Sequence, residues 1–188
     1  MRADYARSSD SNRHRVDIGA IWTLPKGFSL HPFLDAHTGN PFDITTGTDD
    51  NGDTIFNDRP AFATDLTRAS VVRTALGNFD TSPLPGQRLI PRNYGTDPNY
   101  VWLDLATGYS VRVGPRPAAK AGQAAKTDKP YRLRFQVDAQ NILNHNNPGP
   151  PIGVLSSPYF GRSLSLANDF STFSASNRTI LLQSFFSF

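Results

Sequence analysis

Strict alternation of apolar and polar residues is the feature that most constrains this fold. In the segment YRLRFQVDAQ, residues 131–140, every odd position is apolar or aromatic and every even position is polar. Side chains of a β-strand point alternately to opposite faces, so a period of two predicts a strand with one apolar and one polar face. A helical period is almost absent elsewhere in the chain. The sequence therefore predicts an all-β fold.

Four further segments alternate in the same way, and the expected strands lie near residues 14–24, 28–38, 99–112, 130–141 and 178–188. The first two are joined by the Pro-Lys-Gly turn at 25–27, which predicts an antiparallel hairpin. The high content of glycine and proline, 14 and 15 residues, agrees with strands connected by loops. We expect residues 1–188 to form one structural region.

Strands with one apolar and one polar face fit two kinds of protein. In a soluble sandwich the apolar face packs inward, whereas in an outer-membrane barrel it meets lipid and the polar face lines a wet interior. The strands of both kinds of protein alternate in this way, so the pattern alone does not distinguish a sandwich from a barrel. Aromatic residues near strand ends are typical of the interface girdles of a barrel. The residues so placed are Trp22, Tyr100, Tyr109, Tyr131, Phe186 and Phe188.

Connection lengths provide an independent criterion. Residues 142–177 and 39–98 form long connections, whereas 114–129 is shorter and 25–27 is a tight turn. Long outward loops that alternate with short periplasmic turns are typical of bacterial barrels. A compact soluble domain rarely contains a structureless connection as long as 39–98. The topology therefore predicts an antiparallel transmembrane β-barrel segment of about five strands with two long extracellular loops.

Several motifs in a fixed order resemble one known family. The stretch NRHRVDIGAIWTL, the hairpin after it and the loop DDNGDTIFNDRP resemble the C-terminal barrel segment of Oar-like TonB-dependent receptors. FQVDAQNILNHNNPGPP is similar to that family's penultimate strand, and YFGRSLS and NRTILLQSFFSF are similar to its closing loop and last strand. The resemblance covers nearly the whole chain.

The resemblance implies a location in the bacterial outer membrane and a barrel of about 22 strands around a plug. It implies contact with outer-membrane lipid, with the missing strands and plug, and with the barrel assembly machinery through Phe188. TonB would act only through N-terminal parts that this sequence lacks. With about five strands and no export signal, we expect a C-terminal fragment of a receptor for energised uptake, one that does not transport alone.

An acidic loop, residues 47–60, is the candidate metal site. Asp49, Asn51 and Asp53 have the one-three-five spacing of an EF-hand-like calcium loop, and Asp58 follows closely. The twelfth position is Pro60, where a bidentate carboxylate is expected, so an Asx-turn loop is the competing interpretation. Asp49, Asn51, Asp53 and Asp58 are the predicted ligands if Ca²⁺ binds.

Other chemistry has little support in the sequence. His31 and His37 share a strand face but lie about 20 Å apart, too far for one ion, and His145 begins a loop rich in asparagine and proline. No nucleophile, zinc or phosphate-loop motif occurs, so we predict no enzyme and no catalytic residues. The net charge of +3 and scattered basic residues argue against nucleic-acid binding. The alternatives are a soluble all-β binding module with a calcium loop and, with less support, a hydrolase.

Overall fold

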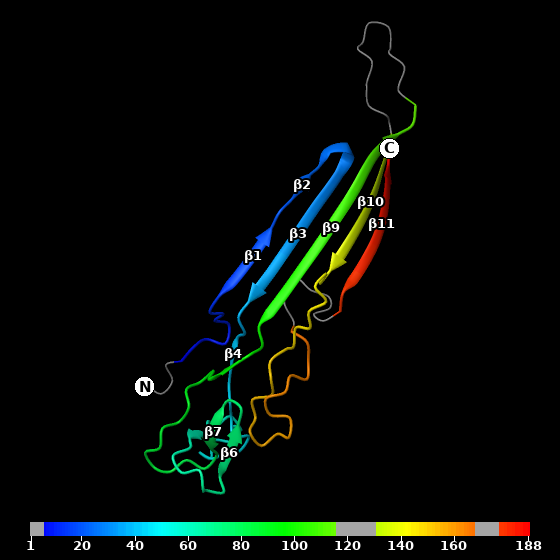
Figure 1. Ribbon diagram of the computed structural model, residues 1–188. Coiled ribbons are helices and arrows are strands. Elements are labelled where there is room, and N and C mark those ends of the chain that lie inside the picture. Colours follow the sequence, from blue (N-terminus) through cyan, green and yellow to red (C-terminus); the bar gives the residue numbers. More distant parts are fainter. Residues whose placement is uncertain (1–5, 116–130, 168–176) are drawn as a thin grey trace. The chain divides into compact units, whose positions relative to one another are not determined.

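The computed structural model describes residues 6–115, 131–167 and 177–188 of the chain (Figure 1). This part of the chain is mostly β, with antiparallel sheets and one short 3-10 turn, η2 (Pro25–Gly27). None of its helical residues forms a helix long and apolar enough to cross a membrane.

The chain divides into two compact units, which are described separately. The sheet unit comprises Val16–Ala36, Val101–Asn146 and Ser176–Phe188. The loop unit comprises Met1–Arg15, His37–Tyr100 and Asn147–Ala175. Each unit combines segments that are far apart in the sequence.

The sheet unit is built on one six-stranded antiparallel sheet. Its strands are β1 (Arg15–Gly19), β2 (Trp22–Thr23), β3 (Phe28–His37), β9 (Tyr100–Val113), β10 (Tyr131–Gln140) and β11 (Thr179–Ser187). They follow the order β1-β3-β9-β10-β11, and β2 also pairs with β3 (Figure 1). All five predicted strands are confirmed, except that the first is divided into β1 and β2.

The strand register assembles the alternating residues into two distinct faces. On β10, Leu133 lies opposite Val111 of β9 and Phe186 of β11. One residue earlier, Arg132 lies opposite Arg112 and Ser187. Because neighbouring strands keep this register, most apolar residues collect on one face and most polar residues on the other, although Phe185 and Leu181 lie on the polar face opposite Arg134 and Asp138.

The turn η2 connects β2 to β3 and requires glycine at its third position. Lys26 and Gly27 both have positive φ angles, of 63° and 87°. A β-carbon on Gly27 would also overlap the backbone oxygen of Ser110. Glycine is the residue that adopts this conformation without steric cost, so it fixes the tight connection between the two strands.

The loop unit has its own short strands and its own core. The strands are β4 (Pro41–Phe42), β5 (Ala61–Phe62), β6 (Val71–Thr74), β7 (Gly77–Asp80) and β8 (Gly95–Thr96). They pair as β4-β8 and as β5-β7-β6 around a core of Ile44, Phe79, Ile90 and Leu155. The expectation that residues 39–98 form a structureless connection is therefore wrong. Its apolar residues are too widely spaced to show a period, yet they meet in space.

Polar contacts hold the segments of the loop unit together. The amide of Thr45 donates to the oxygen of Gly153 at 2.9 Å, and the amide of Leu155 donates to the oxygen of Thr45 at 2.9 Å. Inside the unit, Arg68 forms an ion pair with Asp80, which is fully buried. A buried carboxylate is stable only with such partners, so this pair fixes the β6–β7 hairpin.

Candidate functional site

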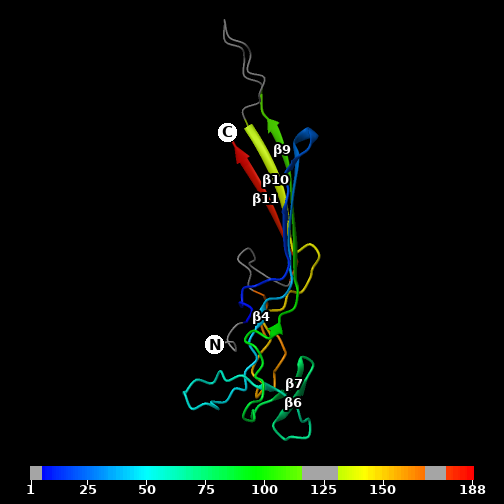
Figure 2. The same ribbon diagram turned by 90° about the vertical axis from the view of Figure 1, so that its left-hand side faces the viewer.

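The apolar face of the sheet is a candidate functional surface. Figure 2 shows the sheet as a single layer. The exposed fraction is 50% for Phe135, 77% for Leu182 and 57% for Phe186. Further exposed apolar side chains on this face are Val16, Ile18, Trp22, Phe28, Val137 and Ile180. Exposed apolar area of this extent marks a surface that contacts lipid or another protein.

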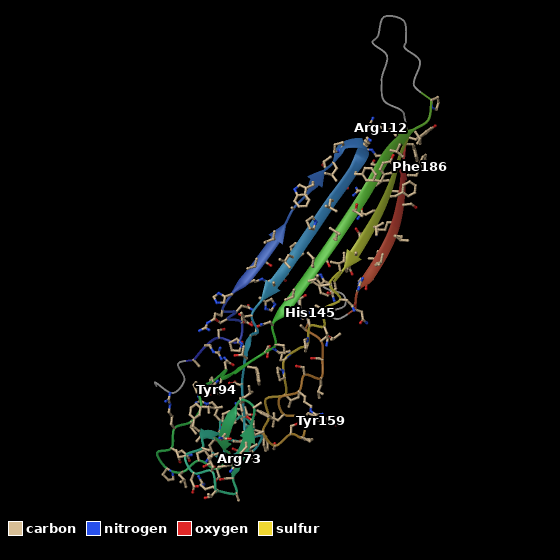
Figure 3. The ribbon with its side chains drawn as sticks, in the orientation of Figure 1. Arg73, Tyr94, Arg112, His145, Tyr159 and Phe186 are labelled. Atoms are coloured by element: carbon tan, nitrogen blue, oxygen red, sulfur yellow. The ribbon has the colours of Figure 1, made fainter. Side chains whose placement is uncertain are left out.

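Aromatic side chains gather on this face near the ends of β10 and β11 (Figure 3, Phe186). The ring centroid of Phe186 lies 5.6 Å from that of Tyr131 and 6.2 Å from that of Phe188. Phe28 and Tyr109, on neighbouring strands of the same sheet, lie 4.8 Å apart. Such a group resembles an interface girdle, in which rings pack at the level of the lipid headgroups.

Tyr100 does not belong to this aromatic group, contrary to the expectation from its position at a strand end. Its side chain is buried and its ring stacks on that of His37 at 4.8 Å, with 10° between the planes. Odd and even positions of β9 face opposite sides of the sheet, and Tyr100 shares its parity with Trp102 rather than with Tyr109. Tyr100 therefore stabilises the loop unit.

The polar face of the sheet carries a cluster of arginines. Arg112, Arg132 and Arg134 line a cavity of about 420 Å³ together with His31 and hydroxyl side chains (Figure 3, Arg112). Further along β10, Gln136 donates a hydrogen bond of 2.7 Å to Asp138. Arg132 and Arg134 are exposed on this face, whereas Asp35 is buried.

The acidic loop is closed by its own backbone. Asp49 accepts hydrogen bonds from the amides of Gly52, Asp53 and Thr54 at 2.8, 3.1 and 2.9 Å. Asp58 accepts from the amides of Asp50 and Asn51 at 2.6 and 3.1 Å, and from the Asn51 side chain at 2.9 Å. These are the contacts of Asx turns, in which a carboxylate caps nearby N–H groups.

The calcium assignment of this loop stays a prediction. Within residues 6–115, 131–167 and 177–188, no three His, Cys, Asp or Glu side chains are grouped so that they could hold a metal ion. Asp53 also caps the loop, because its Oδ1 accepts from the amide of Ile55 at 2.8 Å. Calcium binding at Asp49, Asn51, Asp53 and Asp58 would have to replace several of these hydrogen bonds.

The histidines lie in different local environments. His31 lines the arginine cavity of the sheet, while His37 stacks on Tyr100 and its Nδ1 lies 2.8 Å from the Asn12 side chain. The amide of His145 donates to Asn141 Oδ1 at 3.1 Å, and the Asn141 side chain donates back to the His145 oxygen at 2.8 Å. His145 therefore lies in the loop that follows β10, as the sequence predicted.

The loop unit contains a cavity that the sequence does not predict. It has a volume of about 660 Å³, and its lining comes from segments around Phe42, Val72, Asp97 and Phe160. No motif or spacing connects these positions, because the loop core brings them together only in the folded chain. The cavity size is in the range of small-molecule sites.

Comparison with known proteins gives no match. No protein-family model, no curated protein and no solved structure matches this chain.

Proposed function

We propose that the chain is part of the barrel of an outer-membrane TonB-dependent receptor for energised uptake of a ligand, without enzymatic activity. The apolar face of the sheet contacts acyl chains, and the arginine-bearing face lines an aqueous interior. The remaining strands and the plug are necessary partners, and barrel assembly proceeds through the Phe188 end. In this arrangement the loop unit lies on the cell surface.

The observation that carries the proposal is the exposed apolar face. Side chains such as Phe135 and Leu182 are at least half exposed along the middle of their strands. Burying them in hydrocarbon is favourable by about 25 cal/mol per Å² of apolar surface. The sheet edges also favour this assignment, because lipid cannot satisfy free backbone groups and a barrel pairs every edge.

The alternative is a soluble all-β binding module that uses the acidic loop for calcium. The separate core of the loop unit favours it, because that core resembles the interior of a small soluble domain. This alternative requires another layer to cover the apolar side of the sheet. The two functions therefore differ in what contacts Trp22, which is 52% exposed on that side and lies opposite Leu30.

Quenching of tryptophan fluorescence by brominated acyl chains distinguishes the two functions. The full chain is refolded into phospholipid vesicles with and without bromine on the acyl chains. We expect strong quenching that is lost in Trp22→Phe, which leaves the buried Trp102 as the remaining tryptophan. If the full chain remains in solution or Trp22 fluorescence is unaffected by bromine, the receptor assignment is wrong.

A matched variant tests which side of the sheet meets lipid. Trp22→Phe combined with Thr23→Trp moves the indole one residue along β2, to the opposite face. We expect its fluorescence to be quenched by iodide from water, and only weakly by brominated acyl chains. Equal bromine quenching of the two tryptophan positions would show that the faces are not distinguished by lipid.

A further inference from the structure

The loop unit contains two neighbouring cavities that share one wall. The larger, of about 660 Å³, is lined by apolar side chains that include Phe42, Val72, Leu76, Leu155 and Phe160. The smaller, of about 470 Å³, has a more polar lining. Asp97 and Pro98 line both cavities. A carboxylate therefore borders a space that is otherwise mainly apolar.

The backbone of Asp97 is held firmly in this wall. Its amide donates to the oxygen of Asn40 at 2.8 Å, directly after the β4–β8 pairing. Gly39 lies so close that an added β-carbon would overlap the backbone oxygen of Asp97. The backbone that carries the carboxylate is thus part of a closely packed region of the loop unit.

Within the described part of the chain, the side chain of Asp97 forms no ion pair with a residue of opposite charge. Among the described residues, its buried Oδ1 has no hydrogen-bond donor, and neither has the buried Oδ1 of Asn40 on the same wall. Burial raises the pKa of Asp97, and no neighbouring cation offsets this effect. Arg73, which is labelled in Figure 3 and lines the larger cavity, donates instead to the oxygen of Leu66 at 3.3 Å. The carboxylate of Asp97 therefore places negative charge beside a mainly apolar cavity, which favours a ligand that brings both a donor and a positive charge.

We propose that the larger cavity binds a small amphiphilic amine. The apolar body of the amine lies among Phe42, Val72, Leu76, Leu155 and Phe160, and its ammonium group donates to Asp97. An ammonium group carries three donors and a positive charge, which a neutral alcohol or an amide does not combine. Leu76 is exposed at the rim, so the cavity opens to the surface of the loop unit.

The proposal is tested by titrating the full chain with three probes of equal length. These are n-hexylammonium, 1-hexanol and hexanoate, followed by isothermal calorimetry at one fixed concentration of nonionic detergent. We expect hexylammonium to bind about tenfold or more tightly than hexanol, and hexanoate to bind most weakly, because a charge-assisted hydrogen bond distinguishes them. Equal binding of all three, or no binding of hexylammonium at about 10 mM to folded protein, overturns the proposal.

Two variants and a control identify the site. Asp97→Asn should reduce hexylammonium affinity about tenfold or more and leave hexanol affinity unchanged. Asp65→Asn, which removes an exposed carboxylate of the same unit, should change neither. If Asp97→Asn does not fold, Leu76→Gln replaces it and should weaken hexylammonium and hexanol alike. Unchanged hexylammonium affinity in the folded variant means that an ordered water satisfies Asp97, and it overturns the proposal.

This site does not depend on the proposed membrane function. The titration contains no lipid, and the quenching experiment contains no amine. Failure of either experiment therefore leaves the conclusion of the other unchanged.

Discussion

A charge placed on the apolar face should prevent membrane insertion, whereas the same charge one residue away should not. Leu182 lies near the middle of β11, opposite Val137, and is 77% exposed. Gln183 follows it, points to the opposite face and pairs with Gln136. Leu182→Arg and Gln183→Arg therefore introduce the same side chain at almost the same depth, on different faces of the sheet.

The size of the effect follows from the surroundings of each residue. An arginine that faces lipid near the bilayer midplane costs about 2–4 kcal/mol in a barrel, which corresponds to about 30- to 800-fold in partitioning. In water, a substitution at a side chain as exposed as Leu182 changes stability by about 0.5 kcal/mol or less. Gln183→Arg adds charge to a face that already bears arginines and should cost little in either setting.

The assay is flotation with phospholipid vesicles over a range of lipid concentrations, after refolding from urea. We expect the Leu182→Arg chain to need far more lipid for half-maximal flotation, and the Gln183→Arg chain to behave like the wild type. Urea unfolding in detergent-free buffer serves as the control for general stability. The reasoning is refuted if Leu182→Arg floats normally, or if both variants lose flotation to the same extent.

Three further changes test the loop unit. Asp58→Ala removes acceptors for three N–H groups of the acidic loop, so amide hydrogen exchange there should become faster, equivalent to about 1–2 kcal/mol of local stability. A charged Asp80 stabilises the fold above its unfolded pKa of 3.8 and loses that contribution as pH falls through its lower folded pKa. The urea midpoints of wild type and Asp80→Asn should therefore differ at pH 7, and the difference should shrink as the pH falls below 3.8. Gly153→Ala would overlap the oxygen of Asp43 and should lower the thermal midpoint by several degrees, whereas Gly19→Ala meets only ordinary contacts and should not.

The lowered pKa of Asp80 has a definite physical origin. Burial alone would raise the pKa of this carboxyl, but hydrogen bonds from Ser70, Ser82 and Gln87 and the charge of Arg68 together outweigh burial. Asp97 shows the opposite balance, because burial raises its pKa without compensation. The other charged or titratable side chains that line its two cavities are Arg15, His37, Arg73 and Tyr100. Protonation of Asp80 as pH falls should therefore destabilise the structure around it. Protonation of Asp97 should instead remove the cost of burying its charge.

The long strands could be predicted from sequence because each one carries its own signal. Residues 131–140 alternate without interruption, and β10 has the same bounds. Strands β4, β5 and β8 contain two residues each, too few to show any period. Their positions depend instead on the core around Ile44 and Phe79, whose members lie far apart in the chain.

The candidate sites differ in the same way. The acidic loop is contiguous, so its spacing was visible, although the same spacing fits both a calcium loop and the Asx turns that the carboxylates form. The cavity beside Asp97 combines residues from positions 42 to 161 and has no linear signature. A lone aspartate in a loop is ordinary in sequence, and only its missing donor in the folded chain makes it a candidate.

The strand order of the sheet also limits how its two edge strands can be joined. The edge strands β1 and β11 are separated by three others in an antiparallel arrangement, so these two edge strands run in the same direction (Figure 1). If further strands joined β1 to β11 so that every neighbouring pair were antiparallel, those strands would therefore have to be odd in number.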